Sequence, residues 1–295
     1  NLDLNKKIFQ STSKNYIKTF LDYHANIDAD LVEVHNRPNY INLIKHKFLN
    51  KLILYFHNDP LSMNGSKKIN QRIDLLNNVQ KIIFNSEWSK QRFFIGLPNH
   101  LGLLSQKTFV CYQSSSKIKI DFKKKEKIIS FIGKLNHAKG YDLFGDAILK
   151  ILNKHKDWSA KVIGDEPRER LVYKHKNLNI LGFKSNKFIL EELKKISISV
   201  VCSRWDEPFG RTSLEAASRG AAVIISNKGG LPETARDAII VSPLSSKNLF
   251  NAIEKLILNK KRLLNLQKKN YLNFKLTHKY VANIIDTIRN SFVSK

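Results

Sequence analysis

Residues 203–220, which read SRWDEPFGRTSLEAASRG, constrain the fold of this chain more than any other stretch. They set two carboxylates, Glu207 and Glu215, eight positions apart across a predicted loop-to-helix junction. The preceding run at 198–202, ISVVC, is short and β-branched, which predicts a buried strand. The loop therefore leaves the carboxyl end of a strand, and open α/β sheets bind their ligands at that edge.

The start of the predicted helix is a candidate anion site. A sharp turn at Phe209 and Gly210 would end the loop. The backbone N–H groups of Gly210, Arg211 and Thr212 would then open the helix without partners, an arrangement that favours negative charge. The two glutamates could accept hydrogen bonds from hydroxyls on either side of that anion, as a sugar and a ribose flanking a diphosphate would offer. Alternatively, the first glutamate caps the helix and the second is solvated.

A chain of 295 residues with 42% hydrophobic side chains is long enough for two domains of ordinary size. No apolar run approaches the roughly 18 residues that a membrane-spanning helix needs. The chain opens with NLDLNKKIFQ, which has no apolar signal segment, so we predict a cytoplasmic protein. Cys111 and Cys202 fall in different predicted domains, and we expect them to be buried free thiols.

The formal net charge of +26 at pH 7 indicates nucleic acid, an anionic membrane surface or a phosphorylated substrate as a partner. Because the basic residues are spread along the chain, without a zinc finger or an RNA-binding aromatic motif, we expect no nucleic acid partner. We favour peripheral binding to the inner face of a cell membrane. The base composition of the coding gene is an alternative source of the charge. Without HExxH or CxxC patterns, we expect no metal and no cofactor.

The first part of the chain alternates predicted strands and helices without hairpin signals, which favours a parallel sheet. Strands are expected at 30–35, 52–56 and 81–85, and helices at 14–29, 40–49, 69–79 and after a cap at Ser86. Polar residues gather at two of the strand ends: His35, Asn36 and Arg37 at the first, His57 and Asn58 at the second. They are candidates for binding an acceptor hydroxyl, although either histidine could instead satisfy a backbone carbonyl.

The alternating pattern is lost at 96–127, where a serine run precedes a lysine-rich run, as in a domain linker. We predict a first domain at 1–122, a second at 123–272, and a C-terminal helix at 273–295 that crosses back to the first. Strands of the second domain are expected at 127–132, 160–163, 178–181, 198–202, 222–226 and 239–241. Lys134 and Lys139 flank its first loop, where they could neutralise phosphates or remain solvated.

These segments resemble the retaining glycosyltransferases of family 4, in glycosyltransferase group 1. The matching segments in the second domain are FIGKLNHAKGYDLFGDAI, VIGDEP, ILGF and RWDEPFGRTSLEAASRGAAVIISNKGGLPE. The first domain matches less sharply, through DLVEVHNRP, LILYFHNDP and KIIFNSEWSKQRF. The resemblance implies the α/β GT-B fold, with two Rossmann-like domains whose parallel sheets face across a cleft. Nothing before residue 30 matches the family's usual first strand and Gly-rich loop, so we expect the first domain to be incomplete.

The resemblance also implies roles for the candidate residues. Gly133, Lys134 and Lys139 match the loop that contacts the donor diphosphate, with Lys134 where arginine is more usual. Glu207 matches the first glutamate of the E-x7-E motif, near the donor sugar, and Glu215 matches the second, which holds the ribose. The donor-binding segment between them comprises Pro208, Phe209, Gly210, Arg211 and Thr212.

On the acceptor side, the resemblance assigns His57 to a first-domain position at the site of sugar transfer. The other acceptor-side candidates are His35, Asn36, Arg37 and Asn58, and the catalytic candidates are His57, Lys134, Lys139 and Glu207. The implied activity moves a hexosyl group from a UDP-, GDP- or ADP-sugar to a glycan or lipid-linked acceptor with retained configuration. Such a reaction would serve cell-surface polysaccharide, lipopolysaccharide or glycolipid synthesis. The alternatives are a nucleotide-sugar epimerase or phosphorylase of similar fold and a non-catalytic basic surface-binding protein.

Overall fold

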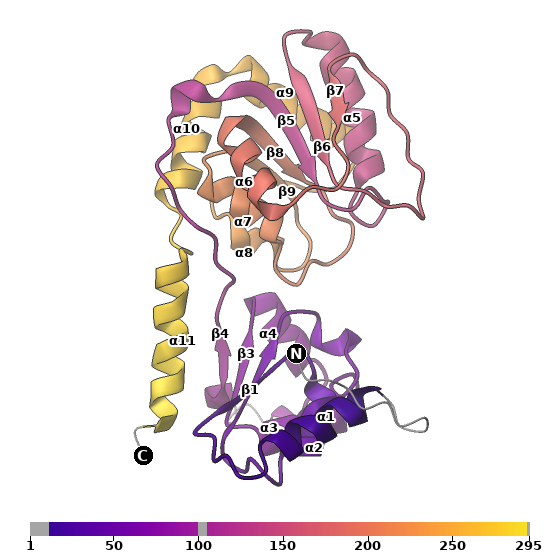
Figure 1. Cartoon of the computed structure of the whole chain (residues 1–295). Coiled ribbons are helices and arrows are strands. Elements are labelled where there is room, and N and C mark those ends of the chain that lie inside the picture. The colour runs from indigo at the N-terminus through magenta and orange to yellow at the C-terminus, as the bar shows by residue number, and fades with distance from the viewer. Residues whose placement is uncertain (1–11, 100–104, 294–295) are drawn as a thin grey trace. The chain divides into compact units, whose positions relative to one another are not determined.

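The computed structural model describes residues 12–99 and 105–293, and Figure 1 shows their elements along the chain. The chain divides into two compact units, one comprising residues 1–112 and 284–295 and the other residues 113–283. The opening NLDLNKKIFQ, in which we predicted no signal segment, lies outside the described residues. Within the described ranges, no helix combines the length and apolar character needed to cross a bilayer.

The first unit is built on a four-stranded parallel sheet with strand order β1-β2-β3-β4. Its strands are β1 (Val32–His35), β2 (Leu52–Phe56), β3 (Lys81–Phe84) and β4 (Thr108–Val110). Its helices are α1 (Thr12–Tyr23), α2 (Ile41–Ile44), α3 (Ile69–Asn78) and α4 (Glu87–Phe94), with 3-10 turns η1 (Pro38–Tyr40) and η2 (Pro60–Ser62). All of β2 is buried, as expected for a parallel strand covered on both faces. The predicted parallel arrangement is confirmed.

Local capping and core packing set the helix bounds in this unit. Ser86 caps α4 as predicted, because its Oγ accepts the N–H of Ser89 at 2.9 Å. The helix predicted at 40–49 is shorter than expected, since α2 ends at Ile44. After Ile44 the chain turns back. The N–H of Phe48 donates a hydrogen bond to the carbonyl of Ile44 at 3.1 Å, and Asn50 adopts a φ of +61°. Phe48 is buried in the core at this turn.

The second unit contains a six-stranded parallel sheet with strand order β10-β9-β8-β5-β6-β7. Its strands are β5 (Glu126–Ile132), β6 (Ser159–Ile163), β7 (Leu178–Ile180), β8 (Ile196–Val201), β9 (Ala222–Ser226) and β10 (Ile239–Val241). Its helices are α5 (Tyr141–Lys154), α6 (Asn186–Lys195), α7 (Arg211–Ser218), α8 (Leu231–Thr234), α9 (Ser246–Leu258) and α10 (Lys260–Leu272), preceded by the 3-10 turn η4 (Phe122–Lys124). α11 (His278–Val293) leads from this unit into the first.

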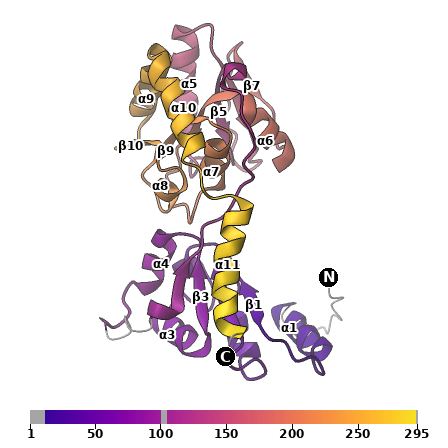
Figure 2. The same cartoon turned by 90° about the vertical axis from the view of Figure 1, so that its left-hand side faces the viewer.

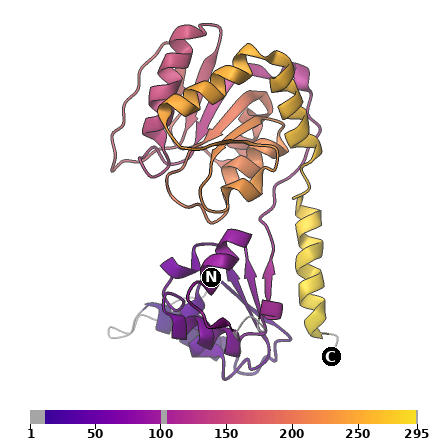
Figure 3. The same cartoon turned by 180° about the vertical axis from the view of Figure 1, so that it is seen from behind.

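The strand order of the second unit explains where its ligand edge lies. The chain moves outward from β5 to β7 and then returns to place β8 on the other side of β5. The order reverses between these two strands, and open α/β sheets bind ligands at such a switch point. Figures 1 and 3 show the sheet from opposite sides, with α6 and α7 over one face and α9 over the other. The loops after β5 and β8 therefore leave adjacent strand ends.

The core of the second unit is formed by the sheet together with α5 and α9. Residues such as Ile129, Val162, Ile198 and Ile224 are fully buried in one continuous cluster with apolar residues of these helices. Burial of β-branched side chains on both faces is typical of a central parallel sheet. Cys202 lies in this cluster, and both cysteines are buried free thiols as predicted.

The division between the units falls after Tyr112, earlier in the chain than the position we placed at residue 123. The serine-rich segment is held by the second unit: Arg219 donates to the backbone carbonyl and to the Oγ of Ser116, the latter at 2.7 Å. The Oγ of Ser115 lies 3.3 Å from that of Ser218. The composition of this segment suggested a linker without contacts to either unit. The hydroxyl contacts left no sign in the sequence, because their partners lie about a hundred positions further along the chain.

Lys125 joins three elements of the second unit through one ammonium group. Its Nζ donates to the carbonyls of Leu193 and Arg219, at the ends of α6 and α7, and to that of Ile196 at the start of β8 (2.8–2.9 Å). Burial, followed by the charge of Arg219, lowers the pKa of Lys125 to about 7. Below that pH the three protons of the ammonium match three carbonyls, and two of these carry the negative end of a helix dipole.

We expect Lys125→Met to lower the free energy of unfolding by about 2–4 kcal/mol, because three carbonyls lose their donor. Urea denaturation at pH 6, where Lys125 is protonated, measures this loss. The matched control is Lys124→Met on the same turn, which removes an exposed lysine and should change stability by less than about 0.5 kcal/mol. Equal stability of the two variants would show that the three-carbonyl contact does not stabilise the unit.

Candidate functional site

The loops after β5 and β8 are joined through one carbonyl. The carbonyl of Ala138, in the first loop, accepts the N–H groups of Arg204 and Trp205 in the second, at 2.9 and 3.1 Å. The hydroxyl of Ser203 also donates to it, at 3.2 Å. The side chain of Arg204 in turn forms two hydrogen bonds with the Asp142 carboxylate at the start of α5. Residues far apart in sequence are therefore fixed as one wall at the switch point.

The beginning of α7 lies at this wall, as the sequence predicted. Gly210 precedes the helix with a φ of +107°, and no side chain caps it. Thr212 Oγ1 donates to the carbonyl of Ile132, the last residue of β5, at 3.4 Å. Within the described residues, the backbone N–H groups of Gly210, Arg211 and Thr212 have no hydrogen-bond acceptor. These donors and the positive end of the helix dipole make an anion site.

Lys139 and Glu207, both predicted donor-site residues, form an ion pair in which Nζ meets Oε1. The backbone of the first loop is fixed beside it, because the N–H of Lys139 donates to Asn136 Oδ1 at 2.9 Å. The Glu207 side chain is only 13% exposed, whereas that of Lys139 is 33% exposed. The cation thus keeps access to solvent while the carboxylate is largely enclosed.

Glu215 is the most buried carboxylate of the predicted set, with its side chain 7% exposed. Its Oε1 accepts Arg211 Nη2 at 2.9 Å, one helical turn earlier, and Asn186 Nδ2 at 3.0 Å from the start of α6. It is therefore not a solvated helix residue. Two donors orient one oxygen, and the second oxygen accepts no hydrogen bond from another described residue, so it has the capacity to accept one from a ligand.

Lys134 lies exposed on the first loop, beyond Gly133, whose N–H donates to Ile163 at 2.9 Å. The charge of Lys134 acts on the carboxylate of Glu166, in the VIGDEP segment after β6. Hydrogen bonds from Arg168, helped by the charge of Lys134, lower the pKa of Glu166 to about 2. Lys134 has no ion pair within 4.0 Å in the described chain, so its charge remains available to an anion.

Gly229 brings the next loop against the backbone of Glu207. A Cβ on Gly229 would lie 2.2 Å from the Glu207 carbonyl oxygen, and its φ of +57° favours glycine. Gly230 N–H donates to that same carbonyl at 2.7 Å. The close approach of this glycine pair is to the loop that carries Glu207. The pair therefore positions the carboxylate.

In the first unit, His35 and His57 meet at the ends of β1 and β2. Their rings stack, with centroids 5.4 Å apart, and His35 Nδ1 lies 3.0 Å from His57 Nε2. Burial, and then the neighbouring His35, lower the pKa of His57, which keeps its imidazole neutral at pH 7. Asn36 Oδ1 accepts the backbone N–H of His57 at 3.2 Å, and Arg37 Nη1 donates to the Asn36 carbonyl.

A second group of residues supports the histidine pair from beneath. The His35 ring stacks on Tyr55 with centroids 4.3 Å apart, and Tyr55 donates its hydroxyl to Glu33 at 3.2 Å. Arg289, on α11, holds both oxygens of Glu33 at 2.7 Å. Asn58 is exposed and has no side-chain contact with the pair among the described residues.

The structure thus brings most predicted residues into two local groups, one in each unit. In the second unit it adds three residues that we did not single out: Asn136, Glu166 and Asn186. Glu166 lies in the segment VIGDEP, which the sequence marked only through its resemblance to the family. Asn186 had no signal, since it is the first residue of a helix and lies 29 positions before the glutamate that it contacts. The roles of the predicted residues remain predictions.

The two parallel sheets and the reversal of strand order beside β5 define the class of two-unit α/β proteins with an open, doubly wound sheet. The profile of the family described as Glycosyl transferases group 1 matches residues 113–272, which is more than half of the chain. The chain belongs to this family. The membership confirms the group 1 resemblance.

Two known proteins and one solved structure are similar to this chain, each over a different share of its length. One relative is a protein of Bacillus subtilis (strain 168) named "Putative glycosyltransferase YtcC". It is 26% identical over 302 residues, which cover 90% of this chain and 73% of YtcC. The lipopolysaccharide core biosynthesis mannosyltransferase LpcC of Rhizobium leguminosarum bv. viciae is 28% identical over 139 residues, covering 43% of this chain and 39% of LpcC. Anabaena Alr3699/HepE in complex with UDP-glucose has a TM-score of 0.73 at 16% identity, covering 97% of this chain and 84% of HepE. This last likeness confirms the predicted GT-B fold.

We expect Gly229→Ala to lower the free energy of unfolding by clearly more than the roughly 1 kcal/mol that a left-handed alanine costs. Its Cβ would push against Glu207, whereas Gly182, with a φ of +67°, has nothing within 4 Å of a Cβ. Gly182→Ala is therefore the matched control and should show the backbone cost alone. Urea denaturation of both variants measures the difference. Equal losses would show that the contact with Glu207 adds no constraint.

Proposed function

We propose that this protein is a retaining hexosyltransferase of family 4 that uses a nucleotide-diphosphate sugar as donor. The acceptor is a glycan or a lipid-linked sugar, in the synthesis of cell-surface polysaccharide or glycolipid. The observation that carries the proposal is the α7 helix start, with Lys139, Glu207 and Glu215 fixed around it. Support also comes from HepE, solved with UDP-glucose, and from LpcC, named as a lipopolysaccharide mannosyltransferase.

In the proposed complex the donor diphosphate lies at the start of α7. The N–H groups of Gly210, Arg211 and Thr212 would bind its oxygens, and Lys134 and Lys139 would neutralise the charge that develops on departure. Glu215 would accept a ribose hydroxyl on its free oxygen, and Glu207 a hydroxyl of the sugar. Because lysines and amides carry the charge, we propose that neither a metal ion nor another cofactor takes part.

The proposed reaction breaks the bond between the anomeric carbon and the diphosphate oxygen. The acceptor hydroxyl forms the new bond on the same face, and its proton passes to an oxygen of the departing diphosphate. This route retains the configuration and uses no carboxylate nucleophile. His57, neutral at pH 7, would hydrogen-bond a sugar hydroxyl, with His35, Asn36, Arg37 and Asn58 as the acceptor-side set.

The direct test incubates the full chain with UDP-, GDP- and ADP-sugars, first by thermal shift and then with free and lipid-linked sugar acceptors. We expect one donor class to stabilise the protein, and proton NMR of the product to show the anomeric configuration of the donor. A chelator should leave turnover unchanged. An inverted product would contradict the retaining assignment. Conversion of the donor sugar without any acceptor would identify an epimerase instead.

We expect Glu215→Ala to weaken nucleotide binding by about 10- to 100-fold, because a charged hydrogen-bond acceptor to the ribose is lost. Titration calorimetry with the diphosphate nucleotide measures this change. Glu191→Ala on α6 is the control, since among the described residues that exposed carboxylate forms an ion pair with Lys194 alone. Unchanged affinity in the Glu215 variant would remove Glu215 from the ribose site.

A further inference from the structure

One face of α10 carries positive charge that nothing in the described chain neutralises. The helix reads KKRLLNLQKKNYL, with five basic residues and no acidic one. Leu263, Gln267 and Asn270 are buried against the second unit, so the opposite face is solvated. All five basic residues (Lys260, Lys261, Arg262, Lys268 and Lys269) are exposed, and none has an ion pair within the described residues.

The same face exposes large apolar side chains. Leu264 is 39% exposed and Leu272 is 68% exposed. With Lys261 and Lys268 they follow one line along the helix, since residues three and four apart lie one above the other. A cationic face with leucines between the cations differs from the purely polar surface of a solvated helix. Such a face offers cations to lipid headgroups and leucines to the boundary with the acyl chains. Figure 2 shows α10 in the foreground of the second unit.

The basic surface continues from α10 onto η4. Phe122 packs edge-on against Tyr271 of α10, with ring centroids 5.8 Å apart. Lys117 reaches the same helix, donating to the Phe274 carbonyl just beyond its end at 3.2 Å. Lys123 and Lys124 follow Phe122 directly and are exposed.

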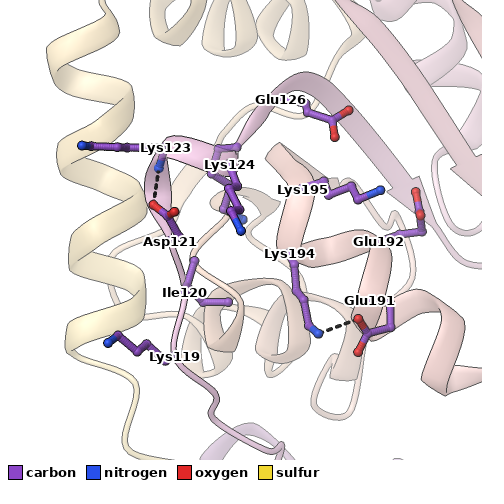
Figure 4. Close-up of a pocket in the computed structure, with 11 residues that line it drawn as sticks. Lys119, Ile120, Asp121, Lys123, Lys124, Glu126, Glu191, Glu192, Lys194 and Lys195 are labelled. Atoms are coloured by element: carbon purple, nitrogen blue, oxygen red, sulfur yellow. Dashed lines mark hydrogen bonds and ion pairs between the residues drawn. The ribbon is translucent and has the colours of Figure 1, made fainter.

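Beyond η4 the surface forms a pocket of about 720 Å³ that reaches the last turn of α6. Figure 4 shows its lysines, of which Lys194 pairs with Glu191 while Lys124 and Lys195 have no ion pair among the described residues. Of the other carboxylates of the pocket, Asp121 caps η4 and Glu192 pairs with Lys161, whereas Glu126 is exposed and has no ion pair among the described residues. The pocket thus adds unpaired cations at the edge of the α10 face.

We propose that α10 and η4 form a surface of the second unit that docks on an anionic lipid membrane. The cations would lie at the level of the lipid headgroups, and Leu264 and Leu272 would enter the boundary with the acyl chains. Each lysine near such a surface contributes about 1 kcal/mol. This role is independent of the proposed glycosyl transfer, because no residue of the surface belongs to the candidate donor site.

The exposed leucines favour a membrane over nucleic acid as the partner. A nucleic-acid surface of equal charge would gain nothing from solvated leucines, and it would use aromatic or arginine side chains to stack on bases. The α10 face has one arginine among five basic residues, and its one aromatic residue, Tyr271, packs against Phe122. Its chemistry therefore fits charged headgroups above an apolar layer.

The test is co-sedimentation of the full chain with vesicles of phosphatidylcholine alone or with about one-third phosphatidylglycerol. We expect binding only to the anionic vesicles, weakened by added salt. The triple variant Lys261→Glu, Lys268→Glu, Lys269→Glu should bind at least about 100-fold more weakly, from three lost contributions. Equal binding of this variant and the wild type would overturn the proposal.

Two further variants separate this surface from net charge and from nucleic acid. Lys156→Glu, Lys174→Glu, Lys176→Glu makes the same charge change at other exposed positions of the second unit and should keep most of the binding. Leu264→Ser with Leu272→Ser keeps every cation and should lose the binding that remains at high salt. An equal loss of vesicle binding in both lysine variants would overturn the membrane assignment. It would also be overturned if the leucine changes had no effect and the protein bound duplex DNA more tightly than the vesicles. Thermal unfolding of each variant, followed by circular dichroism, verifies an intact fold.

Discussion

The pairing of β5 with β8 is the constraint on which the second unit depends. Because the chain runs outward from β5 and returns beside it, two loops separated by some sixty residues begin at adjacent strand ends. A single carbonyl, that of Ala138, then joins them by accepting two N–H groups and a hydroxyl. The loop that carries Glu207 and the helix start of α7 follow directly from this junction, whereas Arg211 and Asn186 orient Glu215.

The excess positive charge serves two different purposes in the second unit. Lys125 is enclosed, and its ammonium group satisfies carbonyls that would otherwise lack a donor. The lysines of α10 are solvated and repel one another, so they do not stabilise the fold. Net charge counts both kinds alike, and only the burial of each side chain separates a structural lysine from one that is free to meet a partner.

Much of the fold followed from the sequence, because buried parallel strands are short, β-branched and separated by helices. The positions of Glu207 and Glu215 followed for the same reason, since each lies a fixed distance from a strand end. Asn186 could not be predicted, because its contact with Glu215 depends on how α6 packs. The division between the units was placed too late because hydroxyl contacts at Ser115 and Ser116 leave no periodic pattern.

The ion pair between Lys139 and Glu207 has a consequence for which molecules the site can hold. An anion that drew Lys139 away from Glu207 would leave an enclosed carboxylate without its counter-charge. A neutral molecule that offered only hydroxyl groups would not replace the positive charge that Glu207 already pairs with. Only a molecule that offers an anionic group and a hydrogen-bond donor at the correct separation satisfies both partners at once. In the proposed donor complex, the diphosphate would face Lys139 while a hydroxyl of the sugar donates to Glu207, so one molecule would meet both partners of the pair.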